Sequence, residues 1–336
     1  MKIVIFETEP WEQPAFDPLK EDHEVVLLET RLTEENSGEV HDAEIISTFI
    51  YSNLDEEILA KFDDLKMIAT RSTGFDHIPL EYFRENNIVV SNVPEYGDNT
   101  VAEHVFGLLL ALSHNLVEAV DRTRRGDFSL RGLRGFDLQG KTFGVIGTGS
   151  IGQHVIKIAR GFNMQVIAFD VKPNHELAQK IGFEYVSMEE LLKTSDIITL
   201  HVPANEHTYH LISDDEFTKM KEGVVLINTA RGSVVHIEAL ARALSAGKVA
   251  AAGLDVLPEE PTIREESELL RSFYREQHNL QTLLAGHVLL RLRNVIITPH
   301  SAFYTKEAIW RILDTTLENI QQYLEGNPIN VVSKKE

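Results

Sequence analysis

The sequence predicts an α/β protein made of two doubly wound parallel-sheet domains. Strand-like apolar runs alternate with helix-like runs along the chain, which is typical of parallel strands joined by right-handed crossovers. The alternation restarts at Gly140 with a cleaner pattern. A chain of 336 residues is also too long for one ordinary core and suits two domains. Its content of 43% hydrophobic and 25% charged residues indicates a folded globular protein.

Four buried strands are expected in the first part of the chain, where short runs rich in Val, Ile and Leu are bounded by polar residues. A helix-like stretch over 55–62 separates the last two of them. These strands are expected over 2–6, 24–28, 44–50 and 66–70.

Six further strands are expected after Gly140, with helix-like stretches before most of them. A doubly wound sheet of this size is an architecture that binds dinucleotides. The six strands are expected over 142–147, 164–170, 196–202, 223–229, 249–256 and 294–300.

One long helix is expected over 99–125, between the two patterns. Thr100 and Glu103 have the spacing of a capping box at its start. The middle of this helix is apolar almost all round, so we expect it to be buried, with a partner subunit as one candidate cover. A last helix is expected over 305–326, ending at Gly326.

Composition excludes several classes of protein. The net charge of −20 argues against a nucleic-acid partner, and the arginine-rich stretch 121–135 is interpreted as a solvated helix end and loop. The absence of cysteine excludes disulfides, thiolate metal sites and cysteine nucleophiles. The first residues soon meet acids and do not predict a signal peptide. The longest apolar run, 105–112, is far shorter than the roughly 20 residues that span a bilayer. We therefore expect a cytoplasmic protein without a membrane partner.

A glycine-rich turn predicts a phosphate-binding site. Gly147, Gly149 and Gly152 form the pattern G-x-G-x-x-G between an expected strand and an expected helix. Such glycines permit a tight turn, a close approach of the pyrophosphate and close packing of helix on strand. Asp170, 18 residues past Gly152, can accept hydrogen bonds from the adenosine ribose and repel a 2′-phosphate, which favours NAD over NADP. Lys172 lies close by and leaves some use of NADP open.

Three polar residues follow the last three expected strands. Arg231, Glu260 and His300 all come where strands end, and ligands of such folds bind at the carboxyl ends of strands. Taken singly, each could be an ordinary surface Arg, solvated acid or helix-capping His. Together they supply a clamp for a carboxylate, a proton donor and an acid that keeps the donor charged.

A set of characteristic stretches occurs in order over nearly the whole chain: TRSTGFDHI, NVPEYGDNTVAEH, GVIGTGSIG, LHVP, INTARGS, GLDV with EEP, and ITPHSAFYT. In this order they resemble the D-isomer-specific 2-hydroxyacid dehydrogenases. The resemblance implies a flavodoxin-like substrate domain from 1–98 and 301–336, and a Rossmann NAD-binding domain over 99–300. It also implies that Arg231, Glu260 and His300 hold the catalytic positions.

The resemblance further implies the residues that bind each ligand. Asp255 is expected at the nicotinamide end, and Ser72, Thr73 and Gly74 match the loop that binds the substrate carboxylate. The expected NAD site comprises Gly147, Gly149, Ser150, Ile151, Gly152, Asp170, Val202, Pro203, Thr229, Ala230, Arg231, Asp255 and His300. The expected substrate site comprises Tyr51, Ser72, Thr73, Gly74, Arg231, His300 and Tyr304.

Aromatic residues favour a small substrate. The stretch after His300 resembles that of the D-lactate dehydrogenase branch, in which the tyrosine matching Tyr304 lies near the substrate, and Tyr51 resembles another aromatic of that pocket. A pocket with such walls favours the interconversion of pyruvate and D-lactate by hydride transfer, with His300 as acid and base. The alternative interpretation is that both tyrosines are ordinary core residues. The alternative reaction has another substrate, namely hydroxypyruvate, glyoxylate or a branched 2-keto acid.

Other interpretations concern different classes. His201, His207 and His210 gather in one stretch, but they lack the full ligand set of a metal motif, so no metal is expected. The same fold serves as an NAD-sensing corepressor with interaction tails, which we do not expect here, and as phosphite or formate dehydrogenases, whose substrates lack a carbonyl to protonate. The long segment 261–293 predicts an extra surface helix pair. A homodimer is expected. His104 is expected to be structural, and His77 to lie in a loop near the hinge.

Overall fold

The structure, a computed structural model, describes residues 1–52, 54–75, 78–258 and 280–333. The chain divides into two compact units: unit 1 is Met1–Tyr96 with Tyr304–Glu336, and unit 2 is Gly97–Phe303. The divisions fall after residues 96 and 303, whereas the sequence suggested divisions after 98 and 300.

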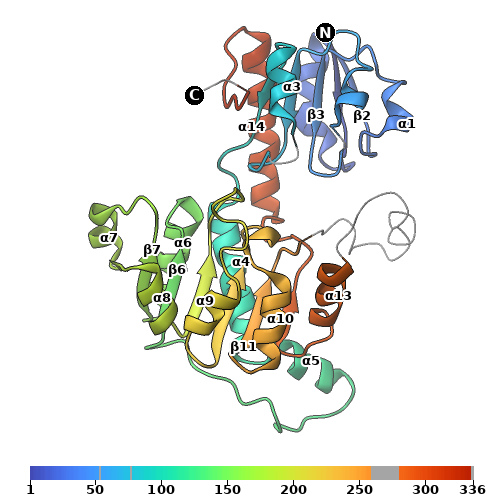
Figure 1. Cartoon of the computed structure of the whole chain (residues 1–336). Helices are drawn as coiled ribbons and strands as arrows, with labels where there is room; N and C mark the ends of the chain where they lie inside the picture. Colours follow the sequence, from blue (N-terminus) through green and yellow to red (C-terminus); the bar gives the residue numbers. More distant parts are fainter. Residues whose placement is uncertain (53, 76–77, 259–279, 334–336) are drawn as a thin grey trace. The chain divides into compact units, whose positions relative to one another are not determined.

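Unit 1 contains a five-stranded parallel sheet in the order β2-β1-β3-β4-β5 (Figure 1). This order is that of flavodoxin-like folds. The four strands expected from the sequence are confirmed. The fifth, β5, was not expected, because its three residues give too short an apolar run to stand out. The strands are β1 (Lys2–Ile5), β2 (Glu24–Leu27), β3 (Ile45–Thr48), β4 (Met67–Thr70) and β5 (Val89–Ser91).

The helices of unit 1 are mostly short, apart from the last one, α14 (Lys306–Leu324). Its N-cap is Thr305, whose hydroxyl accepts a hydrogen bond from the amide of Ala308 at 3.3 Å, and Gly326 has a φ of +82° just past its end. The helix expected over 305–326 is therefore confirmed. The others are the 3-10 helix η1 (Gln13–Glu21), α1 (Glu34–Ser37), α2 (Glu56–Leu59) and α3 (Leu80–Glu85).

Unit 2 contains a seven-stranded parallel sheet in the order β12-β11-β10-β9-β6-β7-β8. From β6 onward this is the order 3-2-1-4-5-6 of a dinucleotide-binding fold with one added strand, and its topological switch point lies between β6 and β9. The six expected strands are confirmed, and the two-residue β8 was too short to expect. The strands are β6 (Thr142–Ile146), β7 (Gln165–Phe169), β8 (Glu184–Tyr185), β9 (Ile197–Leu200), β10 (Val224–Asn228), β11 (Val249–Leu254) and β12 (Val295–Ile297).

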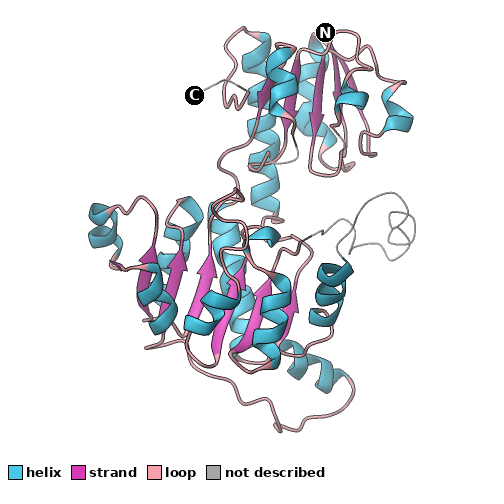
Figure 2. Cartoon of the chain, viewed as in Figure 1, coloured by secondary structure: helices cyan, strands magenta, loops and turns pink. Residues whose placement is uncertain are grey.

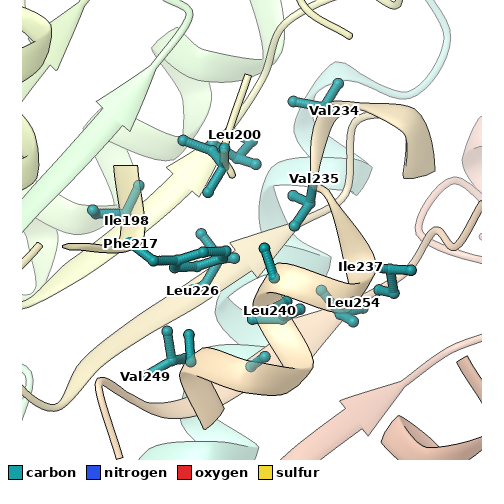
Figure 3. Packing of buried hydrophobic residues seen from close by; sticks show 14 of the residues in the cluster. Ile198, Leu200, Phe217, Leu226, Val234, Val235, Ile237, Leu240, Val249 and Leu254 are labelled. Atoms are coloured by element: carbon teal, nitrogen blue, oxygen red, sulfur yellow. The ribbon is translucent and has the colours of Figure 1, made fainter. Parts of the chain in front are cut away.

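Helices cover both faces of the seven-stranded sheet (Figure 2). Successive residues of β10 alternate between the faces: Leu226 packs in the core under α9 and α10, and Ile227 packs in the core under α4 and α6. Figure 3 shows the core under α9 and α10, where Phe217 and Leu240 lie against the strands. The helices are α4 (Asp98–Ser113), α5 (Leu116–Arg124), α6 (Ser150–Gly161), α7 (His175–Ile181), α8 (Met188–Thr194), α9 (Asp214–Lys219), η2 (Gly232–Val234), α10 (Ile237–Ser245) and α13 (Leu280–Leu289).

The expected helix over 99–125 is wrong in two respects. It is two helices, because Asn115 adopts a left-handed φ of +51° and the amide of Phe136 donates a hydrogen bond to the carbonyl of Ser113 at the end of α4. The expected capping box is also wrong. The N-cap is Gly97, which leaves Thr100 buried inside the helix. The buried middle is confirmed, since α4 packs on α6 and β11 within unit 2.

The segment 261–293 is described only from residue 280, where α13 begins. The expected helix pair otherwise lies outside the described residues, as do Glu260 and His77. Among the described residues, no single helix is long and apolar enough to cross a membrane, although α4 and α5 together meet this test by length and composition, with a bend of 62° between them.

Candidate active site

The glycine turn after β6 is built as the sequence predicts. Gly147 has a φ of +94°, and a Cβ there would lie 2.4 Å from the carbonyl oxygen of His201. A Cβ on Gly152 would lie 2.2 Å from the carbonyl oxygen of Gly147, so helix α6 approaches the turn closely. Gly149 has open space around its Cα and is the N-cap of α6. Because this N-cap carries no side chain, a phosphate can approach the first amides of α6, those of Ser150, Ile151 and Gly152.

Asp170 faces this turn from the end of β7. Its Oδ2 accepts hydrogen bonds from the amide and the hydroxyl of Thr148 at 2.7 and 2.9 Å, and its Oδ1 accepts one from the amide of Lys172 at 2.9 Å. Partial burial opposes ionisation of the carboxyl, but these bonds outweigh burial and lower the pKa of Asp170 below its usual value. The hydroxyl of Thr148 also lies 2.8 Å from that of Tyr185. The sequence pattern missed Thr148 and Tyr185, because it leaves the residue between the glycines unspecified.

Val202 and Pro203 follow β9, on the other side of the switch point. The amide of His201 donates to the carbonyl of Ile146 at 2.8 Å, which ties the end of β9 to the end of β6. The side chain of Val202 would lie 3.1 Å from a Cβ on Gly147. These contacts bring Val202 beside the glycine turn.

The histidines of the 201–210 stretch are held apart in different roles. The ring of His201 lies 2.9 Å from the hydroxyl of Thr199, and burial lowers the pKa of His201 to about 3. His210 stacks on His236 with ring centroids 4.5 Å apart, and burial together with His236 lowers the pKa of His210. Within the described ranges, no group of three or more His, Asp or Glu side chains is arranged to hold a metal ion.

The turn after β10 holds Thr229, Ala230 and Arg231. The side chain of Asn228 accepts from the amide of Ala230 and donates to the carbonyl of Arg231, both at 3.0 Å. Arg231 donates from Nη1 to the carbonyl of Ala230 at 2.8 Å. A Cβ on Gly232 would lie 2.2 Å from the backbone of Leu257, so this turn packs closely against the loop that follows β11. Asn228, which no sequence pattern predicted, therefore fixes the backbone of Ala230 and Arg231.

Asp255 follows β11 and organises the turn that carries His300. Its side chain is 1% exposed, and it accepts hydrogen bonds from the amides of Ser301 and Ala302 at 2.9 Å and from the hydroxyl of Thr298. The amide of His300 donates to the carbonyl of Asp255 at 2.9 Å. His300 itself has a left-handed φ of +52°, a conformation that such surrounding bonds must hold.

His104 of α4 completes this network. Its Nε2 lies 3.0 Å from the hydroxyl of Thr298 and 3.5 Å from Oδ1 of Asp255. The sequence predicts a structural role for His104, and this role stays a prediction. Only the fold could reveal its partners, because they lie more than 150 residues away along the chain.

The expected substrate residues of unit 1 follow β3 and β4. The hydroxyl of Ser72 donates to the carbonyl of Gly74 at 2.7 Å, and the hydroxyl of Thr73 donates to the carbonyl of Val93 at 2.7 Å. Tyr51 is 50% exposed. In unit 1, Tyr51 and the 72–74 loop therefore lie at the same edge of the sheet, the carboxyl edge. Tyr304, before α14, is also exposed.

Comparison with known proteins identifies the family. The model of the D-isomer specific 2-hydroxyacid dehydrogenase NAD binding domain matches residues 106–302. The chain belongs to the D-isomer-specific 2-hydroxyacid dehydrogenase family. The D-lactate dehydrogenase of Escherichia coli (strain K12) is 34% identical over 333 residues, which cover 97% of this chain and 98% of that protein.

Two further relatives frame the reaction. The glyoxylate reductase of Thermococcus litoralis is 35% identical over 337 residues, covering 98% of this chain and 91% of that protein. The crystal structure of D-lactate dehydrogenase from Aquifex aeolicus, complexed with NAD and lactic acid, matches with a TM-score of 0.86 and 36% identity, covering 99% of this chain and 100% of that one. The chain is thus an NAD-dependent D-2-hydroxyacid dehydrogenase, and the glycine turn and Asp170 fit this cofactor.

Proposed function

We propose that this dehydrogenase interconverts a small 2-keto acid and its D-2-hydroxy acid, with pyruvate and D-lactate as the leading pair. The observation that carries the proposal is that Arg231, Asp255 and His300 share one edge of the sheet of unit 2. They follow β10, β11 and β12, three neighbouring strands, at the sheet edge that also carries the glycine turn. In a doubly wound sheet, that edge is where ligands bind.

The proposed chemistry assigns one task to each side chain. NAD, when bound, exchanges a hydride with the carbonyl carbon of the substrate. His300, protonated, donates a proton to the carbonyl oxygen during reduction, a contribution of roughly 10²–10⁴-fold to the rate. Arg231 offers a planar guanidinium to the substrate carboxylate. Glu260, which lies outside the described residues, keeps the imidazole of His300 charged and oriented.

Asp255 supports this chemistry through the backbone. The bonds from its carboxylate to the amides of Ser301 and Ala302 fix the turn after His300. A fixed turn holds the imidazole at one place relative to the hydride acceptor, which is the orientation that acid catalysis needs.

The substrate preference rests on unit 1. We propose that the backbone of Ser72, Thr73 and Gly74 binds the carboxylate, and that Tyr51 and Tyr304 limit the room for the remaining substituent. The relative solved with lactic acid supports a three-carbon substrate. The relative named glyoxylate reductase keeps glyoxylate as the alternative substrate.

A turnover panel tests the reaction. The initial rate of NADH oxidation is measured with pyruvate, glyoxylate, hydroxypyruvate, 2-ketobutyrate and a branched 2-keto acid, and the configuration of the product is determined with a stereospecific enzyme. We expect pyruvate to give the highest kcat/KM, and 2-ketobutyrate to be tolerated, because one methylene changes discrimination by only roughly 1–3 kcal/mol. An L product, or a clear preference for hydroxypyruvate or the branched acid, contradicts the proposal. A protein without turnover on any of these acids would point to a binding function instead.

The role of His300 is tested by replacement. His300→Ala should lose most of kcat for pyruvate while NADH still binds, because the imidazole acts in the chemical step. The matched control is His207→Ala, which removes an exposed histidine outside the proposed site. Equal losses in the two variants, or a His300→Ala enzyme with near-normal kcat, would remove His300 from the mechanism.

We also propose a homodimer. Helix α5 has no buried residue in the described structure, and it exposes Leu116, Val117 and Val120, next to a loop that exposes Phe128 and Leu130. Exposed apolar side chains gathered in one region commonly mark an interface. Sedimentation of the protein should give the mass of a dimer, and Val120→Asp should shift it toward the monomer.

A further inference from the structure

Two loops of unit 1 are anchored on the same residues at the end of β1. Arg71, which precedes Ser72, donates from Nη2 to the carbonyls of Phe6 and Glu7, both at 2.7 Å. The carboxylate of Glu7 accepts hydrogen bonds from the amide of Tyr51 at 3.2 Å and from the hydroxyl of Ser52. Glu7 therefore links the loop after β4 to the loop after β3.

The charges at this junction are mostly removed from water. The side chain of Arg71 is 3% exposed, and burial lowers the pKa of Arg71, while the carboxylates of Glu7 and Glu12 favour its charged form. A buried guanidinium is tolerated only where hydrogen bonds and opposite charges compensate for its lost hydration. In Arg71 the bonds of Nη2 and the nearby carboxylates supply this compensation, while Nη1 is buried without a hydrogen-bond partner among the described residues.

Hydrogen bonds also define the backbone geometry of Glu7 and of Ser52. Glu7 has a left-handed φ of +55°, which a glutamate adopts only when its surroundings impose it. Ser52 is held from a second side, since its hydroxyl accepts a hydrogen bond from the amide of Leu32 at 2.9 Å. Tyr51, between β3 and Ser52, thus starts from a fixed backbone although its ring is half exposed.

We propose that Glu7 is a positioning residue that sets the spacing between the 72–74 loop and Tyr51, and thereby limits the size of the substrate side chain. The inference rests on the proposed function, in which the 72–74 loop binds the substrate carboxylate and Tyr51 faces the substituent. If the spacing is fixed, a longer substituent meets Tyr51. If Glu7 no longer ties the two loops together, Tyr51 can move away and longer substituents are accepted.

The test compares three acids on the full-length enzyme with NADH: glyoxylate, which has no side chain, pyruvate, and 4-methyl-2-oxopentanoate. In Glu7→Asn the residue remains compatible with a positive φ, but its side chain is too short to reach both partners and carries no charge. We expect the ratio of kcat/KM for 4-methyl-2-oxopentanoate to that for pyruvate to rise about tenfold, the factor for one lost hydrogen bond to a charged group at the low end of its range. The kcat/KM for glyoxylate should stay within about twofold, because glyoxylate has nothing that touches Tyr51.

Four further single variants and one double variant separate positioning from general stability. Glu7→Gln keeps the length of the side chain: its amide oxygen can accept from the amide of Tyr51, and its NH2 group can donate to the hydroxyl of Ser52, which is able to accept as well as donate. It should therefore restore the selectivity for pyruvate. Tyr51→Ala should relax selectivity as Glu7→Asn does, and the double variant should add no further change, because both act through the same ring. Glu9→Gln removes an exposed charge two residues away and is the matched control. Ser52→Ala breaks the same link from the other side and replaces Glu7→Asn if that variant does not fold.

The outcomes are distinct. A uniform loss with all three acids, including glyoxylate, would reduce Glu7 to a structural residue and overturn the inference, as would unchanged ratios in both Glu7→Asn and Ser52→Ala. Additive effects of Tyr51→Ala and Glu7→Asn would also overturn it. If the unmodified enzyme turns over none of the three acids, the proposed function itself fails, and this inference falls with it.

Discussion

The cofactor preference should depend on the carboxylate of Asp170, and Asp170→Ala is the perturbation that exposes this dependence. The lowered pKa of Asp170 keeps the carboxylate ionised at neutral pH. The amide and hydroxyl of Thr148 and the amide of Lys172 already donate to it, and the backbone of Val171 also helps to lower its pKa. Carboxylate oxygens each accept more than one hydrogen bond, so we expect a ribose hydroxyl of NADH to donate to Asp170 as well.

The size of the effect follows from the charge. A hydrogen bond to a charged group contributes about 1.5–3 kcal/mol, so the loss of one ribose bond should weaken NADH binding by about 10- to 150-fold. The binding of NADPH should suffer less or improve, because the negative carboxylate no longer faces the 2′-phosphate. The preference for NADH over NADPH should therefore narrow by at least about tenfold.

The assay measures Kd and kcat/KM for both cofactors at saturating pyruvate. Thr148→Val is the control for the second task of Asp170, since it removes the hydroxyl that the carboxylate holds but leaves the charge in place. We expect Thr148→Val to weaken both cofactors equally. The reasoning is refuted if Asp170→Ala also weakens both cofactors by the same factor, because Asp170 would then serve only to hold the glycine turn. Equal efficiency with NADH and NADPH in the unmodified enzyme would refute it directly.

Three further predictions concern unit 2. Gly152→Ala should lower the free energy of unfolding by about 1–3 kcal/mol in chemical denaturation, because the new Cβ would lie 2.2 Å from the carbonyl oxygen of Gly147; Gly149→Ala, which has open space, should keep that stability and lose NADH affinity only. Asp255→Asn should lower kcat for pyruvate and the melting temperature, since one amide oxygen cannot replace two carboxylate oxygens for Ser301 and Ala302; an unchanged kcat would count against the fixed turn. The folded-state pKa of His201 is lowered to about 3, from an ordinary value of 6.5. Between about pH 6.5 and pH 3 the imidazole therefore binds a proton in the unfolded chain but not in the folded one, so the free energy of unfolding falls as the pH is lowered. The stability difference between the unmodified protein and His201→Asn should therefore shrink by about 1–2 kcal/mol from pH 7 to pH 5, and a difference independent of pH would show that the ring is not buried as a neutral group.

The sequence by itself determined the features whose causes are local. Apolar runs of strand length gave ten of the strands, because a strand buried on both faces must be apolar at every position. The glycine turn could also be read, since the positive φ of Gly147 and the close approach at Gly152 exclude side chains whatever surrounds them. Arg231 and His300 were proposed as site residues from their places after strands, which is information that the order along the chain contains.

The tertiary structure decided what depends on residues far apart in the chain. The break between α4 and α5 needs Phe136 to reach the carbonyl of Ser113, while the apolar pattern runs on through the break. The role of Asp255 as the anchor of the turn at His300 depends on amides more than 40 residues away. The link from Arg71 through Glu7 to Tyr51 joins three segments of unit 1. Single side chains in these sets carry no periodic or spacing signal, because hydrogen bonds and ion pairs between distant segments are selected by three-dimensional proximity, which the order of residues alone does not specify.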